Sequence, residues 1–223
     1  MTSSPIAPVV LWSKPAEQRA GTPLLVLLHG YGANEADLFG LAEQLPAEFM
    51  IAAVRAGQSA GSGFAWFPLQ SDLIISIEAV TSAALELDEW LDSIAADFSS
   101  VTLLGFSQGM AMASTLARHR PERFAAVVGL SGFIIDAEAD PYFKDAELEK
   151  EKLPFFWGRD QADPVLPQAL IEQSNEWLAK HTKLTKVLYT GMWHGICQAE
   201  IGHVGEFLRA EVLNAQKSEP TDR

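Results

Sequence analysis

Ser107 lies between two glycines in the segment LLGFSQGMAMA, residues 103–113. Gly105-Phe106-Ser107-Gln108-Gly109 fits G-x-S-x-G, with a strand-like apolar run before it and a helix-like sequence after it. In so sharp a turn, side chains at the two glycine positions would clash, and their absence exposes the serine hydroxyl. The pattern predicts a nucleophilic serine. An inert serine in a glycine-rich turn is the alternative, because short motifs also occur by chance.

A serine hydroxyl needs a general base, and four histidines follow Ser107 in the chain. We interpret His119 and His181 as surface residues in the cationic last turns of helices, and His203 as a structural residue of the final helix. His194 differs, because it lies in a short loop between a predicted strand and the last helix. That position would place its side chain at the edge of the sheet where catalytic residues gather. We therefore predict His194 as the base.

The carboxylate that orients the base must come from the segment FFWGRDQADPVLP, which follows another predicted strand. Asp163 precedes a proline that begins a turn, and we predict it as the acid of the triad. Asp160 lies in the same loop and remains the alternative, since spacing alone does not separate the two. A helix-capping role without chemistry is the other reading of either residue.

The loop after the early strand supplies a candidate oxyanion hole. Gly30 and Gly32 let the backbone N–H of Tyr31 turn toward the point that the N–H of Gln108 also faces. Each well-placed donor of this kind contributes roughly 3 kcal/mol to transition-state stabilisation. His29 is expected to brace this loop.

Short apolar runs alternate with amphipathic ones along the chain. Apolar residues recur at helical spacing in two segments, which predicts a helix within 78–98 and another near the end of the chain: Leu87, Leu91, Ile94 and Phe98 in the first, and Ile201, Val204 and Leu208 in the second. Asn34 is predicted to cap a further helix over 35–45. Buried strands are predicted at 23–30, 49–56, 101–107, 124–132, 153–158 and 185–191. This alternation predicts an α/β fold, with a mainly parallel sheet covered by helices on both faces.

Length and composition agree with one globular domain over residues 1–213. The chain has 223 residues, of which 48% are hydrophobic, and residues 214–223 are expected to form a flexible tail. The Gly/Ser-rich and then aromatic segment 56–77 is predicted to be a long functional loop.

The charge of the chain restricts its partners. A net charge of −13 argues against nucleic acid or an anionic membrane surface as the main partner. The N-terminus does not resemble a signal peptide, no run could span a bilayer, and Cys197 is the one cysteine, so we expect a cytoplasmic protein. No zinc motif occurs, and Glu35 stands where a dinucleotide-binding loop needs its third glycine.

Four segments in this order, LLHGYGANEADL, LLGFSQGMAMA, the Asp163-Pro164-Val165 turn and GMWHGICQAE, together resemble the carboxylesterase/phospholipase family of α/β-hydrolases. The family includes acyl-protein thioesterases and small bacterial carboxylesterases. The likeness covers nearly the whole chain. It departs from the family in the longer interval between Trp157-Gly158 and Asp163, which keeps Asp160 open, and in Gly195, where a serine usually follows the histidine.

The resemblance implies a serine carboxylesterase that needs neither metal nor cofactor. Ser107 would be the nucleophile, His194 the base and Asp163 its orienter, with the Tyr31 and Gln108 amides as the oxyanion hole. The substrate would be a small-molecule or lipid ester with a short to medium acyl chain. Acyl-protein thioesterase or lysophospholipase activity, and a non-catalytic binding role on the same scaffold, are the alternatives. A homodimer is also implied. The matching aromatic and apolar segment gives the expected acyl-chain contacts: Trp66, Phe67, Leu73, Ile74 and Ile75.

Overall fold

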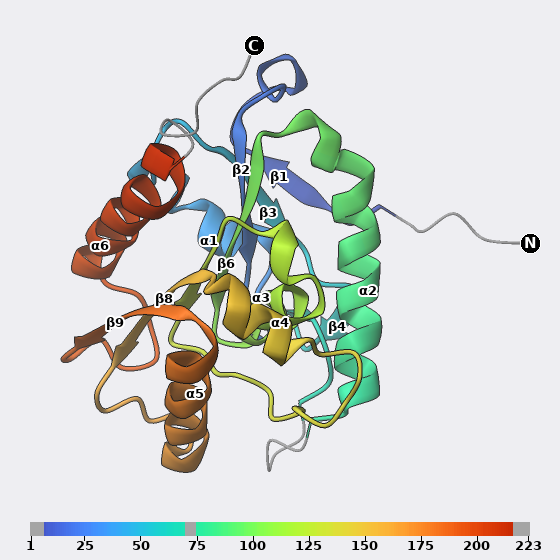
Figure 1. Ribbon diagram of the computed structural model, residues 1–223. Helices are drawn as coiled ribbons and strands as arrows, with labels where there is room; N and C mark the ends of the chain where they lie inside the picture. Colours follow the sequence, from blue (N-terminus) through green and yellow to red (C-terminus); the bar gives the residue numbers. More distant parts are fainter. Residues whose placement is uncertain (1–6, 70–74, 216–223) are drawn as a thin grey trace, which may run out of the picture.

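A seven-stranded sheet forms the centre of the computed structural model, which describes residues 7–69 and 75–215 (Figure 1). Its strands lie in the order β1-β3-β2-β6-β7-β8-β9, and all neighbouring pairs are parallel except β1 with β3. The strands are β1 Val10–Trp12, β2 Pro23–Leu28, β3 Met50–Val54, β6 Ser100–Phe106, β7 Ala126–Leu130, β8 Pro154–Asp160 and β9 Lys183–Tyr189.

Helices cover both faces of this sheet (Figure 1). The α-helices are α1 Glu35–Phe39, α2 Ile77–Ile94, α3 Gln108–His119, α4 Asp145–Glu151, α5 Gln168–His181 and α6 Gln198–Leu208. Short 3-10 turns lie at Ala16–Gln18, Ala42–Gln44, Ala95–Asp97 and Pro121–Arg123, and a π-helical turn at Arg209–Leu213 continues α6. In the part of the chain that the structure describes, no helix is both long enough and apolar enough to cross a membrane.

The side chains of β2 alternate between two hydrophobic cores. Leu24 and Val26 pack with the helices α2, α3, α4 and α5 on one face, whereas Leu25 and Leu27 pack with α1 and α6 on the other. A strand buried on both sides in this way needs apolar residues at successive positions, as PLLVLL provides. The architecture is the α/β-hydrolase fold that the sequence predicts.

The predicted strands and helices are present, with corrections at three places. The expected helix over 35–45 ends at Phe39 and gives way to a 3-10 turn, since Gly40 interrupts it. The segment 56–77 is not a continuous loop, because β4 Gln58–Ala60 and β5 Gly63–Ala65 form a hairpin within it. The antiparallel edge strand β1 was also missed, since three residues are too few to show a periodic pattern.

Candidate active site

Ser107 occupies the turn between β6 and α3, in a backbone conformation that non-glycine residues rarely adopt. Its φ is 53° and its ψ is −116°, and its N–H donates to the Leu130 carbonyl of β7 at 2.9 Å. A Cβ on Gly105 would overlap the backbone of Gly109, and one on Gly109 would overlap the Leu28 carbonyl of β2. The two glycines therefore permit the close packing that holds the strained turn.

His194 lies between Ser107 and Asp163. Its Nε2 is 2.9 Å from the Ser107 hydroxyl oxygen, and its Nδ1 is 2.8 Å from Oδ2 of Asp163. The other oxygen of Asp163 accepts the backbone N–H groups of Val165 and Leu166, and the carboxylate is fully buried. With Nδ1–H donating to the carboxylate, Nε2 is left with a lone pair that can accept the serine proton.

Asp160 fixes the loop that carries His194, residues 190–197 between β9 and α6, which is called the histidine loop below. Its carboxylate accepts the N–H groups of Met192 at 2.5 Å, Trp193 at 2.8 Å and Ala162 at 2.7 Å. These backbone donors keep the pKa of Asp160 below its usual range. Trp193 has a φ of 59°, so the backbone immediately before His194 is turned into the left-handed region. The structure thus places Asp163 beside the His194 ring and Asp160 against the backbone turn that precedes His194.

The same loop is anchored on its other side by β7 and α6. The Ser131 hydroxyl donates to the Gly195 carbonyl at 3.0 Å, and the Ser131 N–H donates to Gly158 of β8 at 2.8 Å. Glu200, in the first turn of α6, packs directly against Gly158 and is fully buried. This burial raises the pKa of Glu200 to about 8. An uncharged carboxyl group therefore lies between Gly158 of β8 and the first turn of α6 at neutral pH.

Two backbone amides lie close to the serine. Gln108 is the first residue of α3, so its N–H has no acceptor within the helix. In the loop after β2, a Cβ on Gly30 would lie 3.5 Å from Cβ of Ser107, which places the neighbouring Tyr31 close to the nucleophile. No hydrogen bond from the Tyr31 N–H occurs within residues 7–69 and 75–215. Both predicted oxyanion donors are accordingly free to bind a ligand.

His29 braces this loop as expected from the sequence. Its Nε2 accepts the Ala56 N–H at 3.1 Å, which leaves Nδ1–H to donate to the Gly30 carbonyl at 2.8 Å. Burial lowers the pKa of His29. The ring is therefore a neutral connection between β3 and the loop that carries Tyr31.

The predicted substrate contacts fall into two groups. Trp66 and Phe67 are almost completely buried, and the Gln108 side chain fixes them by accepting the Trp66 N–H and donating to the Phe67 carbonyl. Trp66 also lines a cavity of about 660 Å³ between the end of β3, the β4–β5 hairpin and α2. Ile75 is partly buried against the same core. Leu73 and Ile74 lie outside the described residues.

Sequence reasoning missed the supporting residues of the site. Asp160 was considered as a rival triad acid or a helix cap, and the Gln108 side chain and Glu200 were not considered at all. Two signals were present in the sequence: an Asp ending a buried strand, and a Glu in the first turn of an apolar helix face.

The chain belongs to the phospholipase/carboxylesterase family, whose model matches residues 14–212. This family comprises α/β-hydrolases, in agreement with the fold and with the order of the motifs. No curated protein sequence gives a significant match.

Several solved structures share the fold. Esterase PE8 is 27% identical, with a TM-score of 0.73 over 92% of this chain and 99% of its own. The carboxylesterase of Bacillus cereus is 21% identical, with a TM-score of 0.76 over 91% of this chain and 93% of its own. Acyl-protein thioesterase 2 of Zea mays is 24% identical, with a TM-score of 0.73 over 92% of this chain and 99% of its own. The last two likenesses show the fold alone.

Proposed function

We propose that this protein is a serine carboxylesterase that hydrolyses esters of short to medium acyl chains. The observation that carries the proposal is the continuous hydrogen-bonded series from Asp163 through His194 to Ser107, with heavy-atom distances of 2.8 and 2.9 Å. Each distance is within the range that proton transfer requires. The strained backbone of Ser107 and the two unpaired amides beside it support the same role.

In the first half of the reaction, the Ser107 oxygen attacks the ester carbonyl while His194 Nε2 takes the hydroxyl proton. The tetrahedral oxyanion accepts the N–H groups of Tyr31 and Gln108. His194 then protonates the leaving alcohol, and the acyl group remains bound to Ser107. In the second half, His194 deprotonates a water molecule that attacks the acyl-enzyme. His194 then returns this proton to the Ser107 oxygen as the bond to the acyl group breaks and the carboxylic acid is released. Asp163 stabilises the imidazolium that forms in each half.

The segment around Trp66 is the proposed position of the acyl chain. Phe64 and Leu87 lie with Trp66 in the lining of the cavity described above, which no triad residue lines. The Gln108 side chain connects the Trp66 segment to the turn that holds Ser107. The triad does not distinguish an alcohol from a thiol as the leaving group, so acyl-protein thioesterase activity is the second candidate. The likeness to acyl-protein thioesterase 2 of Zea mays favours testing it.

The proposal is tested by hydrolysis of p-nitrophenyl esters of increasing acyl length, with no added metal, by the wild type and Ser107→Ala. We expect a burst of p-nitrophenol from the wild type and a loss of about 10⁴-fold or more in kcat for Ser107→Ala, because the nucleophile is removed. Ser93→Ala, at an exposed serine of α2, is the matched control and should keep the wild-type rate.

The acyl length with the highest kcat/KM would measure the size of the acyl site. Matched oxygen esters and thioesters of that length would then separate an esterase from a thioesterase. A folded wild type that hydrolyses neither series, with no difference from Ser107→Ala, would refute the catalytic proposal and favour a binding role for the scaffold.

A further inference from the structure

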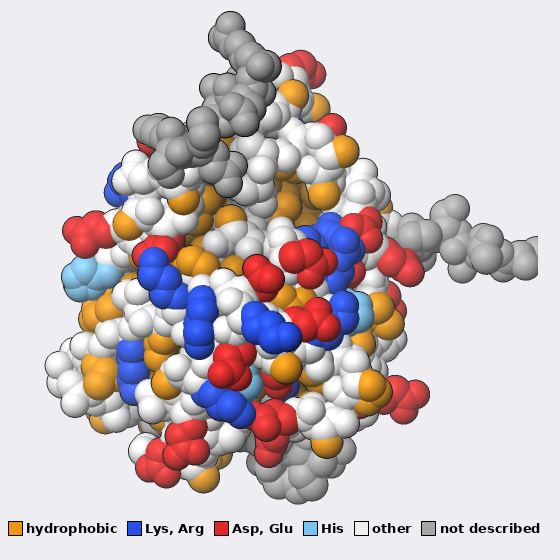
Figure 2. All heavy atoms as spheres, viewed as in Figure 1, with side chains coloured by type: hydrophobic (Ala, Val, Ile, Leu, Met, Phe, Trp, Pro, Cys, Tyr) orange, Lys and Arg blue, Asp and Glu red, His pale blue; other side chains and the backbone are white. Residues whose placement is uncertain are grey.

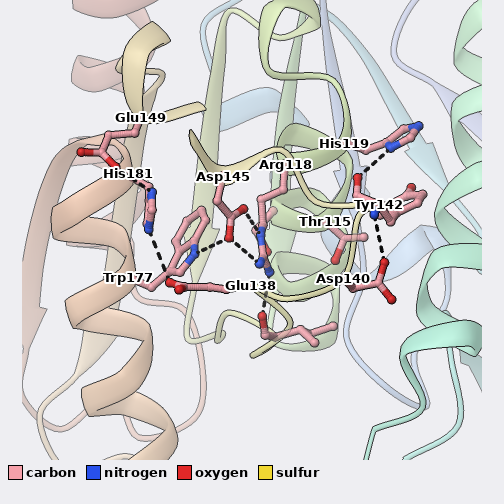
Figure 3. A network of polar contacts seen from close by, with 12 residues as sticks. Thr115, Arg118, His119, Glu138, Asp140, Tyr142, Asp145, Glu149, Trp177 and His181 are labelled. Carbon is pink, nitrogen blue, oxygen red and sulfur yellow. Dashed lines mark hydrogen bonds and ion pairs between the residues drawn. The ribbon is translucent and has the colours of Figure 1, made fainter. Parts of the chain in front are cut away.

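A second histidine meets carboxylates on the face of the sheet that carries α4 and α5. Figure 3 shows His181, the last residue of α5, between Glu138 and Glu149, with Asp145 beside them. Glu138 comes from the segment between β7 and α4, and Asp145 is the first residue of α4. One ligand atom each of Glu138, Asp145 and His181 lies within 4.8 Å of the other two.

His181 is buried, which corrects its interpretation as a surface residue: the residue is 3% exposed. Neither ring nitrogen makes a hydrogen bond within the described part of the chain. Nδ1 faces a carboxylate oxygen of Glu149 at 3.4 Å, and Nε2 faces one of Glu138 at 3.5 Å. A neutral imidazole has a single N–H, so it can donate to only one of these two acceptors. The other nitrogen needs a second proton or a metal ion.

The separation of His181 Nε2 from the Glu138 oxygen fits a metal ion. A distance of 3.5 Å is long for a charge-assisted hydrogen bond. Two ligands on a tetrahedral zinc ion, with bonds of 2.0 to 2.2 Å, are about 3.4 Å apart. The third ligand, Asp145, would complete a His, Glu and Asp set with a water molecule in the remaining position.

The local charge also favours a cation. Glu138, Glu149 and Asp145 supply three carboxylates, and among residues 7–69 and 75–215 Arg118 is the one guanidinium that pairs with them. The C-terminal end of α5, where His181 lies, adds a partial negative charge. At the same end of α5, Nζ of Lys152 donates a hydrogen bond to the Lys180 carbonyl oxygen at 3.2 Å. Figure 2, viewed from the same side as Figure 1, shows acidic and basic side chains interleaved on the surface.

Outer contacts would orient the ligands. The Asp145 carboxylate accepts Nε and Nη2 of Arg118 at 2.7 and 2.8 Å and the indole N–H of Trp177 at 3.1 Å, as Figure 3 shows. Glu149 faces Nδ1 of His181, so a proton held there leaves the Nε2 lone pair directed toward Glu138. Carboxylates in this outer position fix the tautomer of metal-binding histidines. Arg118 stays close to the ion, and its charge weakens binding.

We propose that Glu138, Asp145 and His181 Nε2 bind a divalent transition metal ion, zinc in the first place. The ion would connect the segment before α4 to the ends of α4 and α5. Zinc binding at this position is independent of the proposed esterase reaction, since none of its ligands belongs to the triad.

The test is a zinc titration of the chelator-treated full chain by calorimetry, repeated with cobalt for its visible absorption. Wild type, Glu138→Gln, His181→Gln and His119→Gln are compared at pH 7. Glu138 is largely exposed, so its variant keeps the fold even if His181→Gln does not. His119 lies nearby on α3, stacked on Tyr142, and serves as the matched control. Any zinc held by other residues would be common to all four proteins, so only the difference between variants is informative.

We expect the wild type and His119→Gln to bind one more zinc equivalent than His181→Gln, with tetrahedral cobalt bands that His181→Gln lacks. Glu138→Gln should weaken that binding at least 10-fold, because a charged ligand is lost. Identical zinc isotherms for the wild type, Glu138→Gln and His181→Gln would overturn the proposal.

Discussion

The surroundings of His194 and His181 differ although each ring lies beside carboxylates. His194 faces a carboxylate on one nitrogen and a hydroxyl on the other, at 2.8 and 2.9 Å. His181 faces carboxylates on both nitrogens, at 3.4 and 3.5 Å, without a hydrogen bond. The first arrangement suits one proton that moves between oxygen and nitrogen. The second suits a bound cation.

The supporting contacts differ in the same way. The histidine loop of the candidate active site is held by backbone N–H groups on Asp160, whereas Glu138 and Glu149 reach His181 as exposed side chains. Backbone contacts fix a side chain at a set distance, and exposed side chains can move toward a cation. A histidine with carboxylate neighbours is therefore assigned from distances and partners, since its residue types alone do not separate the two roles.

The largest expected effect that tests this comparison is that of Asp163→Asn. Asparagine keeps the shape but can direct its N–H₂ group at His194, which favours the wrong tautomer and removes the charge that stabilises the imidazolium. We expect kcat for p-nitrophenyl ester hydrolysis to fall about 10⁴-fold. The measurement is steady-state kinetics, with circular dichroism to check folding.

The counterpart in the other region is Glu149→Gln, which changes the carboxylate facing Nδ1 of His181. Because Glu149 is partly exposed, the free energy of unfolding should change by less than about 1 kcal/mol. A loss of only a few-fold in kcat for Asp163→Asn would contradict the assigned difference between the two histidines.

The turn that holds Ser107 could be predicted from local sequence, whereas the positions of the other site residues depend on tertiary contacts. Gly105 is required by sterics within five residues, since its Cβ would overlap the backbone of Gly109, whereas Gly109 is required by its approach to the Leu28 carbonyl of β2. The G-x-S-x-G pattern carries both requirements, so Ser107 could be predicted as the nucleophile from the sequence alone. The choice between Asp160 and Asp163 depended on which carboxylate meets the His194 ring and which meets the backbone before it. Asp163 meets the ring and Asp160 meets the Trp193 N–H, and the spacing of the two residues in the sequence carries no such information. His181 was assigned to the surface because its own helix is cationic at that end. Its burial comes from α4 and the segment before it, which are remote in sequence.

Asp160→Asn tests whether backbone contacts hold His194 in place, because it weakens the support of the histidine loop and changes no residue of the triad. Asp160 uses Oδ2 for the Met192 and Trp193 N–H groups and Oδ1 for that of Ala162. Asparagine has one oxygen, so its N–H₂ group must oppose one of these two sets of donors, and the support of the left-handed turn at Trp193 is weakened. We expect kcat to fall about 10- to 100-fold with little change in KM, because misplacement of a catalytic group mainly affects the transition state. The measurement is kcat and KM for the best p-nitrophenyl ester.

A matched control for Asp160 is Asp140→Asn. Asp140 also accepts a backbone N–H, that of Tyr142, at 2.9 Å, but it lies away from the triad. Equal rates for Asp160→Asn and the wild type would show that the turn holds His194 in place without the carboxylate.

The remaining expected effect is on stability and not on rate, and it concerns Glu200, the buried carboxyl group that packs against Gly158. Its pKa is raised from 4.5 to about 8 in the folded protein, chiefly by burial. Between these values the unfolded chain is ionised while the folded protein keeps the proton, so the free energy of unfolding should fall as pH rises. One proton contributes a slope of at most about 1.4 kcal/mol per pH unit. Below pH 4.5 both states are protonated, and the contribution disappears.

Urea denaturation at pH 5, 6, 7 and 8 would measure this slope, with Glu206→Gln on the exposed side of α6 as the control. Glu200→Gln is isosteric and uncharged, so its free energy of unfolding should increase relative to that of the wild type as the pH rises. Parallel curves for the two proteins would mean that Glu200 is ionised in the folded state. In that case a negative charge, and not a neutral carboxyl group, would lie against Gly158 of β8.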